Sequence, residues 1–354
     1  GQSMLPVLLP VLRWRKVTVT EFAQRFRDPL LREALPQFFQ FSRPDFPMML
    51  LLTTLAMMND REAGYPMGGS LEFAQDLAER YLEVGGEIHY RSRVEKILVE
   101  DDLAVGVRLA DGTERRGDIV ISAADGHSTL FDMLPERYLD EKTRAYYRQL
   151  PVATSILQIS LGVARDMSGE PPVLNYPLPQ PLRIGGVRHG RLVVKHYCFD
   201  PAMAPPGHSV LSVWCEADYD FWKALRADRD QYRAAKQEVG AQIVAALDER
   251  YPGLEEAVEV IDVATPVTYE RYTANWRGAF AGWALTTRKM GMMMGQAMSK
   301  TLPGLNGFYM IGQWVEPGGN VELSAGSGRD VIKDICRERD RPFRTSIDAD
   351  TGSA

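Results

Sequence analysis

The sequence has 354 residues, of which 45% are hydrophobic and 25% are charged. At about 150 residues per domain, this length predicts two globular domains with a sizeable buried core. The net charge of −6 argues against nucleic acid as the main partner, because no basic stripe is available to neutralise phosphates. The three cysteines are widely spaced, so the sequence predicts neither a disulfide framework nor a metal site and is typical of a cytoplasmic protein.

The first sixty residues are expected to be mainly helical. Residues 4–12 are apolar but are interrupted by two prolines, so they do not have the pattern of a signal peptide. Residues 18–58 have helical spacing, and Thr20 is the expected cap of the first helix. The apolar run at residues 48–58 is too short for a bilayer, which requires roughly twenty residues. A core helix is the default interpretation of this run, and a helix lying in the membrane interface is the alternative.

Residues 65–123 form the clearest unit and combine one helix with several strands. The helix is expected to be capped by Ser70 and to end at Gly85-Gly86, with one apolar stripe along its length. A short strand containing Ile88 and Tyr90 is expected next. Further strands are expected at residues 94–100, at residues 105–109 with a hairpin turn at Asp111-Gly112, and at residues 119–121. This order predicts an α/β unit.

The middle of the chain predicts a second domain that is rich in antiparallel strands. An amphipathic helix is expected at residues 131–150, and the proline-rich residues 171–181 predict an irregular loop or an edge strand. The other expected elements are strands at residues 154–163, 192–199, 209–215 and 258–268, and a long helix at residues 227–250 that Tyr251-Pro252-Gly253 stops.

The last part of the chain is expected to return to the first domain. Phe308 to Ile311 predicts a strand, and a helix is expected to follow Gly318-Gly319 and to run to about Cys336. The Met-rich residues 290–298 are expected to be flexible. The charged and polar tail at residues 338–354 is expected to be disordered.

Two glycine-rich segments are the candidate cofactor site. They are Tyr65-Pro66-Met67-Gly68-Gly69-Ser70 and the run from Gly307 to Gly319. Each predicts a turn that leads into a helix N-terminus, where unpaired backbone N–H groups favour an anion or an electron-rich ring. Because the two turns are more than half the chain apart, they predict one site built from both ends. The Gly-x-Gly-x-x-Gly fingerprint of dinucleotide-binding proteins is absent from the sequence.

Four segments, taken in order, resemble the phytoene desaturases and carotenoid isomerases, which are FAD-dependent flavoproteins of the amine-oxidase type. They are residues 65–88, 94–123, 265–272 and 302–329, which include Gly312-Gln313-Trp314 and Gly318-Gly319. The resemblance implies a mixed α/β, two-domain FAD/NAD(P)-binding fold, with the N-terminal βαβ unit of that fold absent from this chain. The implied FAD-binding domain comprises residues 61–130 and 290–337. The implied substrate domain comprises residues 131–289 and a helical part at residues 1–60.

The resemblance also implies which residues contact FAD. They are Gly68, Gly69, Val94, Gly312, Gln313, Pro317, Gly318, Gly319 and Val321. The strand of Val94 is implied to contact the adenine, and the helix after Gly319 is implied to direct its N-terminus toward the flavin. The implied substrate is an apolar polyene or a related lipid. Redox members of the family move hydride between the substrate and the flavin, whereas isomerase members use the flavin without net oxidation, and the sequence leaves both types open. No single catalytic residue is predicted, because the cofactor carries the reaction.

Two departures from the family pattern leave an alternative open. The fingerprint is missing, so we expect FAD binding by this chain alone to be weak or absent. Asn320, Glu322 and Leu323 also stand where the family pattern has glycine, proline and glycine. The alternative is a flavin-free scaffold that binds an apolar ligand or completes a cofactor site with another chain. Peripheral membrane contact and oligomer formation are further expectations.

Overall fold

The computed structural model describes residues 13–14, 16–39, 44–62, 64–284, 286, 298–316 and 320–345. A five-stranded antiparallel sheet with the strand order β6-β7-β8-β5-β9 is its largest unit. Its strands are β5 (Ile156–Val163), β6 (Val173–Ile184), β7 (Val187–His196), β8 (Ser209–Glu216) and β9 (Val258–Ala264). The mixed α/β fold class expected from the sequence is confirmed.

One face of this sheet forms the main hydrophobic core. The helices of this unit are α7 (Tyr219–Leu225), α8 (Arg229–Arg250), α9 (Leu254–Ala257) and α10 (Pro266–Thr273). Alternate β5 residues such as Ile159 and Leu161 are buried against α8, which contributes Ile243 and Leu247. The intervening β5 residues, such as Gln158 and Ser160, lie on the other face of the sheet, because successive side chains in a strand point to opposite faces.

Three expectations for residues 131–289 are refined by the structure. The proline-rich segment is an edge strand, β6, whose register with β7 shifts between Pro177 and Leu182. The strand expected at residues 258–268 ends at Ala264, because Thr265 makes a capping box and Pro266 begins α10. The helix expected at residues 131–150 is also interrupted. It consists of Ser128–Asp132, Glu136–Tyr138 and α6 (Glu141–Gln149).

The smaller α/β unit contains two short sheets and the helix α12 (Val321–Glu338). Its strands are β1 (Val94–Glu100), β2 (Leu103–Leu109) and β3 (Glu114–Arg116) in one antiparallel sheet, and β4 (Val120–Ser122) parallel to β10 (Phe308–Met310) in the other. Tyr309 of β10 packs against Val331 and Ile335 of α12. Segments from distant parts of the sequence therefore meet in this unit, as expected. The tail at residues 346–354 and the Met-rich residues 290–297 lie outside the described residues.

The helix α5 (Gly69–Glu83) joins the two sheet units but leaves its apolar stripe uncovered. Leu71, Leu77 and Tyr81 are 71%, 56% and 52% exposed. The cap is Gly68 in the left-handed region and not Ser70, and no side chain caps this helix. No strand forms at residues 88–90, and Tyr90 is 77% exposed. The expectation of a strand there was wrong because a strand needs a partner, and no described strand pairs with this segment.

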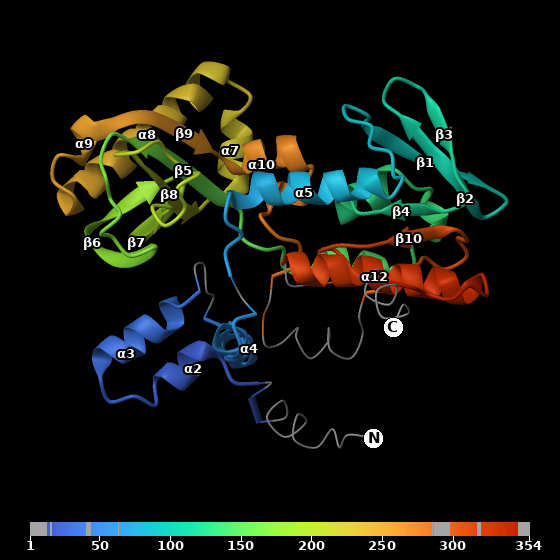
Figure 1. The fold of residues 1–354 in the computed structure, drawn as a ribbon, viewed down its shortest axis with the longest axis horizontal. Helices are drawn as coiled ribbons and strands as arrows, with labels where there is room; N and C mark the ends of the chain where they lie inside the picture. The colour runs from blue at the N-terminus through green and yellow to red at the C-terminus, as the bar shows by residue number, and fades with distance from the viewer. Residues whose placement is uncertain are drawn as a thin grey trace, which may run out of the picture.

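The N-terminal helices form a separate lobe below the five-stranded sheet in Figure 1. They are α2 (Val19–Ala23), α3 (Pro29–Ala34), the 3₁₀ turn Leu35–Gln37 and α4 (Met48–Asn59). Thr18, not Thr20, caps α2 through a capping box with Glu21. Arg191 of β7 pairs with Glu33 of α3 at 2.5 Å and links the lobe to the sheet. Within the described residues, no helix is long and apolar enough to cross a membrane.

The uncovered stripe of α5 leads to a stability prediction. We expect Leu77→Ala to change the free energy of unfolding by no more than about 0.5 kcal/mol, because the side chain is largely solvated. Leu247→Ala in α8 is the matched control, since Leu247 is fully buried and its truncation should cost about 2–5 kcal/mol. Urea unfolding followed by circular dichroism measures both. A loss above about 2 kcal/mol for Leu77→Ala would show that the stripe is covered in solution.

Candidate cofactor site at the junction of the two units

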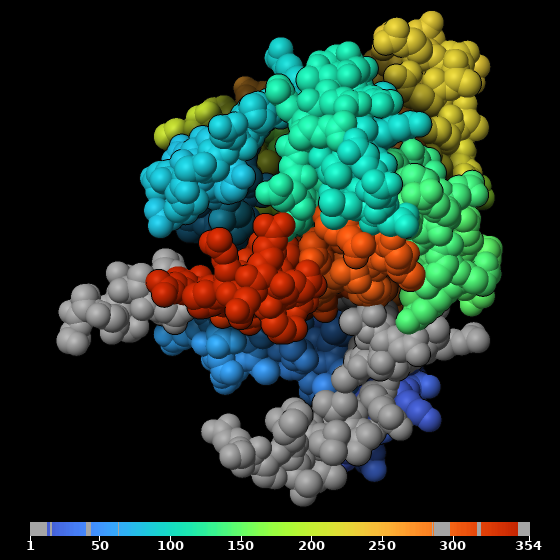
Figure 2. Space-filling view, turned by 90° about the vertical axis from the view of Figure 1, so that its right-hand side faces the viewer, coloured from blue at the N-terminus to red at the C-terminus, as the bar shows by residue number. Residues whose placement is uncertain are grey.

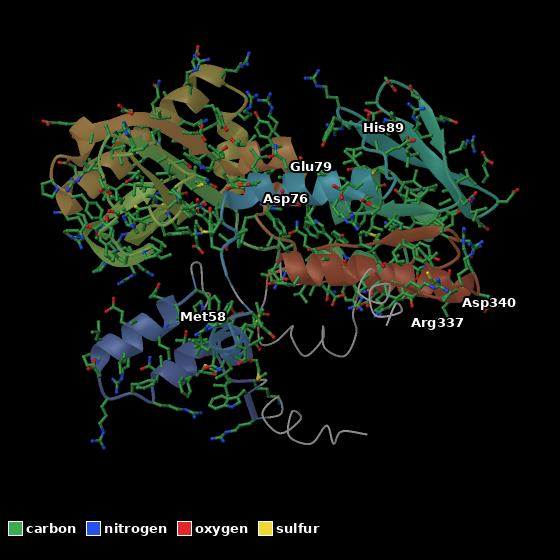
Figure 3. All side chains as sticks on the ribbon, viewed as in Figure 1. Met58, Asp76, Glu79, His89, Arg337 and Asp340 are labelled. Carbon is green, nitrogen blue, oxygen red and sulfur yellow. The ribbon has the colours of Figure 1, made fainter. Side chains whose placement is uncertain are left out.

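The helices α5 and α12 begin at the same end of the molecule. Their N-termini face the five-stranded sheet, and both helices run away from it toward the smaller unit (Figure 1). In the space-filling view α5 is separated from α12 by a recess in which deeper atoms are visible (Figure 2). Figure 3 shows Asp76 and Glu79 on α5, well beyond its N-terminus. The N-terminal ends of both helices therefore border the junction between the two sheet units.

The turn at Gly68-Gly69 is held in place by the second domain. Gly68 and Gly69 have φ values of +89° and +83°, in the left-handed region where glycine is favoured. The Gly68 amide donates to Oδ2 of Asp200 at 2.8 Å, and Asp200 is 3% exposed. This amide is therefore engaged within the protein, contrary to the expectation that both turns offer unpaired N–H groups. The buried carboxylate of Asp200 therefore fixes the position of the turn at Gly68-Gly69.

The second turn, at Gly312, is tied to α12. Gly312 has a φ of +91°, and its amide donates to Oγ of Ser327 at 2.7 Å. Its carbonyl accepts from the amides of Val315 and Glu316. As at Gly68, the amide predicted to face the cofactor is engaged within the protein. The hydroxyl of Ser327 instead fixes the distance between the end of β10 and the first turns of α12.

Gln313 contacts the segment that follows α10. Its Nε2 donates to Oδ1 of Asn275 at 3.0 Å. A Cβ added at Gly282 would lie only 2.5 Å from the Gln313 carbonyl, so this close approach of two backbones requires glycine. The loop that follows β10 is therefore positioned by residues that the sequence analysis assigned to the other domain.

The N-terminus of α12 offers backbone donors that have no partner among the described residues. Asn320 caps the helix by accepting from the Leu323 amide at 2.9 Å. The amides of Val321 and Glu322 have no intrahelical partner, because helix geometry leaves the first N–H groups unpaired. Val321 is also 58% exposed. Pro317, Gly318 and Gly319 lie outside the described residues.

Val94 does not share the junction with the glycine turns. It begins β1, where it pairs with Leu109, and β1 lies beyond the far end of α5 (Figure 1). The fifteen residues of α5 correspond to a helix of roughly 22 Å. The predicted residues therefore form an extended series along α5 and not a single cluster.

A buried aromatic cluster fastens the two units together, and the sequence analysis missed it. Asp125, which is 3% exposed, accepts from the amides of Ser128 and Trp276, each at 2.8 Å. The aromatic side chains of Tyr147 and Trp314 pack against Gly126. A Cβ added at Gly126 would lie 2.3 Å from the Tyr147 hydroxyl and 2.8 Å from Cβ of Trp314. The one sequence signal was Asp125-Gly126, which follows the expected strand at residues 119–121 after three small residues.

Two polar atoms of this cluster are buried without a hydrogen-bond partner in the described part of the chain. They are the hydroxyl of Tyr147 and Nε1 of Trp314. Burial raises the pKa of Tyr147 well above its usual range, with the charge of Asp125 as a further cause. Leaving a buried donor unpaired costs about 1–3 kcal/mol, so such a group calls for a partner such as an ordered water or a ligand. Both atoms lie at the junction, so their position is compatible with a polar ligand there.

The sheet face that lacks α8 is polar. Tyr269 donates to Oε1 of Gln158 at 2.7 Å, and Nε2 of Gln158 donates to Oγ of Ser160. Nζ of Lys195 lies 3.5 Å from the ring centroid of Trp214, and burial lowers the pKa of Lys195. This face therefore supplies hydrogen-bonding groups and one half-buried cation.

Three of the five histidines pack within the fold, and the other two, His89 and His208, lie on the surface beside carboxylates. His127 stacks between Phe131 and Trp276, while burial lowers the pKa values of His189 and His196. Within the described ranges, no three His, Cys, Asp or Glu side chains gather in a way that could hold a metal.

The residues present fit FAD in part. The helix N-terminus of α12 and the orphaned donors near Gly126 would suit an electron-rich ring and its polar edge, whereas the amides of Gly68 and Gly312 are already paired. The two glycine turns would act through the shape of the backbone and not through these two N–H groups.

Comparisons with known proteins agree with this arrangement. The model of the flavin containing amine oxidoreductase family matches residues 15–336. The chloroplastic prolycopene isomerase of Arabidopsis thaliana is 28% identical over 284 residues, which cover 78% of this chain and 47% of that protein. The 4,4'-diapophytoene desaturase of Methylomonas is 23% identical over 351 residues, which cover 95% of this chain and 66% of that protein. The chain spans about half the length of the prolycopene isomerases that it matches.

Solved structures share the fold. An oxidoreductase from Methanosarcina mazei superposes with a TM-score of 0.62 at 19% identity, covering 92% of this chain and 71% of that protein. A variant of putrescine oxidase superposes with a TM-score of 0.59 at 12% identity, covering 93% and 70%. The family match extends across both sheet units and the helical lobe. The chain belongs to the flavin containing amine oxidoreductase family.

Proposed function

We propose that this chain functions in an FAD-dependent oxidoreductase that moves hydride between the flavin and an apolar polyene. The observation that carries the proposal is the family match over residues 15–336, together with relatives named as prolycopene isomerases and phytoene desaturases. These relatives also favour an enzyme over a flavin-free scaffold.

The geometry of the junction supports a flavin there. The N-terminus of α12 carries a partial positive charge, which stabilises an anion placed against it. When bound, FAD would supply the hydride chemistry. The chain's own residues would hold and orient it, with the amides of Val321 and Glu322 facing its ring and the Gly68-Gly69 turn closing the other side of the recess.

An apolar substrate is supported by the helical lobe. Leu55 and Met58 of α4 are 44% and 54% exposed, and Figure 3 places Met58 on the lobe. The polar sheet face with Gln158, Lys195 and Tyr269 would meet a polar end of the substrate or the edge of the cofactor. Contact of the lobe with a membrane surface and formation of oligomers stay predictions.

A flavin titration tests the proposal. We expect the chain to quench the fluorescence of FAD saturably, with weak affinity, because the fingerprint segment is absent from this sequence. Riboflavin, which lacks the adenine and the phosphates, should bind more weakly. Addition of a polyene under anaerobic conditions should then change the flavin absorbance. A linear response that is the same for FAD and riboflavin would contradict binding at a built site.

The contact between Asp200 and Gly68 gives a second prediction. We expect Asp200→Ala to lower the free energy of unfolding by about 1–3 kcal/mol, because the half-buried Gly68 amide loses its acceptor. It should also weaken FAD binding severalfold, since the turn before α5 is released. Asp166→Ala is the matched control, because Asp166 bonds only locally to the Ser168 amide on the surface.

Urea unfolding and the flavin titration measure both effects. Asp200→Asn keeps an oxygen acceptor in a side chain of the same size. It should therefore lose less stability and less FAD affinity than Asp200→Ala. Unchanged stability and unchanged FAD affinity in Asp200→Ala would show that this carboxylate does not position the turn.

A further inference from the structure

A groove runs along the outer side of the five-stranded sheet unit, between α8, α10 and the edge strand β9. Two adjoining cavities of about 410 and 590 Å³ form it, and they share Arg233, Lys236, Asp262 and Val263. In Figure 1 this region lies at the upper left, around the labels α8 and β9. It lies on the α8 side of the sheet, opposite the face that carries Gln158, and none of its lining residues is among those described at the junction. The groove is therefore independent of the proposed flavin site.

One end of the groove is strongly basic. Five cations line the first cavity, against one carboxylate, Asp262, so its lining carries a net charge of +5 − 1 = +4. The cations are Arg226, Arg229, Arg233, Lys236 and Arg271. Arg233 pairs with Asp230 at 3.4 Å on the exposed surface. In the described part of the chain, the other four form no ion pair within 4 Å, although Arg226 and Arg271 stack on neighbouring tyrosines.

The other end of the groove is mainly apolar. Its apolar lining consists of Gly240, Ala241, Val244, Val258, Ile261 and Val263, with Gln237 and Glu255 at its margin. A Cβ added at Gly240 would lie 3.2 Å from Cγ2 of Ile261, so this glycine lets α8 approach β9 closely. Ile261 is 47% exposed on the edge strand. From Arg229 to Val244 the groove follows about 22 Å of helix.

We propose that this groove binds one molecule of a single-chain lipid with a phosphate monoester head. We infer the head group from charge complementarity with the basic end of the groove. A phosphate monoester bears about −1.5 to −2 charges and three acceptor oxygens, which suits several arginines better than a single carboxylate does. The apolar chain would lie over Gly240 and Ile261, where burial contributes about 0.8 kcal/mol per CH₂. The two halves of the groove thus match the two halves of one amphiphile.

Calorimetric titration with dodecyl phosphate, below its micelle concentration, tests the proposal on the full chain. We expect saturable binding of one equivalent that weakens as salt is added, because the head contact is electrostatic. Inorganic phosphate and dodecyl trimethylammonium should each bind at least tenfold more weakly. Inorganic phosphate binding as tightly as dodecyl phosphate would overturn the lipid assignment. The cationic detergent binding equally well would overturn the role of the arginines.

Matched variants locate the site. Arg229→Glu with Arg271→Glu should weaken dodecyl phosphate binding at least tenfold, and both positions are exposed, so the fold should be retained. Ala241→Glu, also on the exposed surface of α8, should weaken dodecyl phosphate but not inorganic phosphate. Arg188→Glu on β7 is the control, since it reverses a charge outside the groove. Equal affinity in the double variant and in the control would overturn the proposal.

Discussion

The arrangement of the candidate site depends on the buried carboxylate of Asp125. It accepts two amide hydrogen bonds, one from Ser128 at the start of the short helix Ser128–Asp132 and one from Trp276, which lies 151 residues away in the sequence. Hydrogen bonds to a charged group contribute about 1.5–3 kcal/mol each. The aromatic rings of Tyr147, Trp283 and Trp314 pack around this point. The end of β4, the loop after β10 and the second domain are therefore held together as one body.

The same junction explains why distant segments can serve one ligand. Asp200 fixes the Gly68 turn from the side of the five-stranded sheet, and Ser327 fixes Gly312 from α12. Gly68 and Gly312 adopt left-handed conformations that help to position the starts of α5 and α12. Their own amides are hydrogen-bonded within the protein. Donors without a partner in the described part of the chain lie at the start of α12. In this account the protein contributes shape and a helix dipole, and the cofactor contributes the reactive chemistry.

Local patterns predicted most of the elements. The alternation in β5 and β8, the hairpin at Asp111-Gly112 and the stop after α8 are all seen in the structure, because each depends on residues close in sequence. The strand at residues 88–90 was wrong because its formation depends on a partner that alternation cannot reveal. Ser70 was wrong as a cap because Asp200, 130 residues away, holds the turn through Gly68. The sequence patterns did not predict the aromatic cluster, because its members lie far apart in the chain, from Asp125 to Trp314.

The central claim is that the start of α5 and the start of α12 contact the same flavin. Hydrogen-exchange mass spectrometry of the chain with and without FAD tests it most directly. The account predicts that FAD slows exchange in peptides covering residues 65–70 and in peptides covering residues 311–325, while peptides covering residues 229–244 in α8 stay unchanged. Protection in only one of the first two segments, or in neither, would contradict the claim.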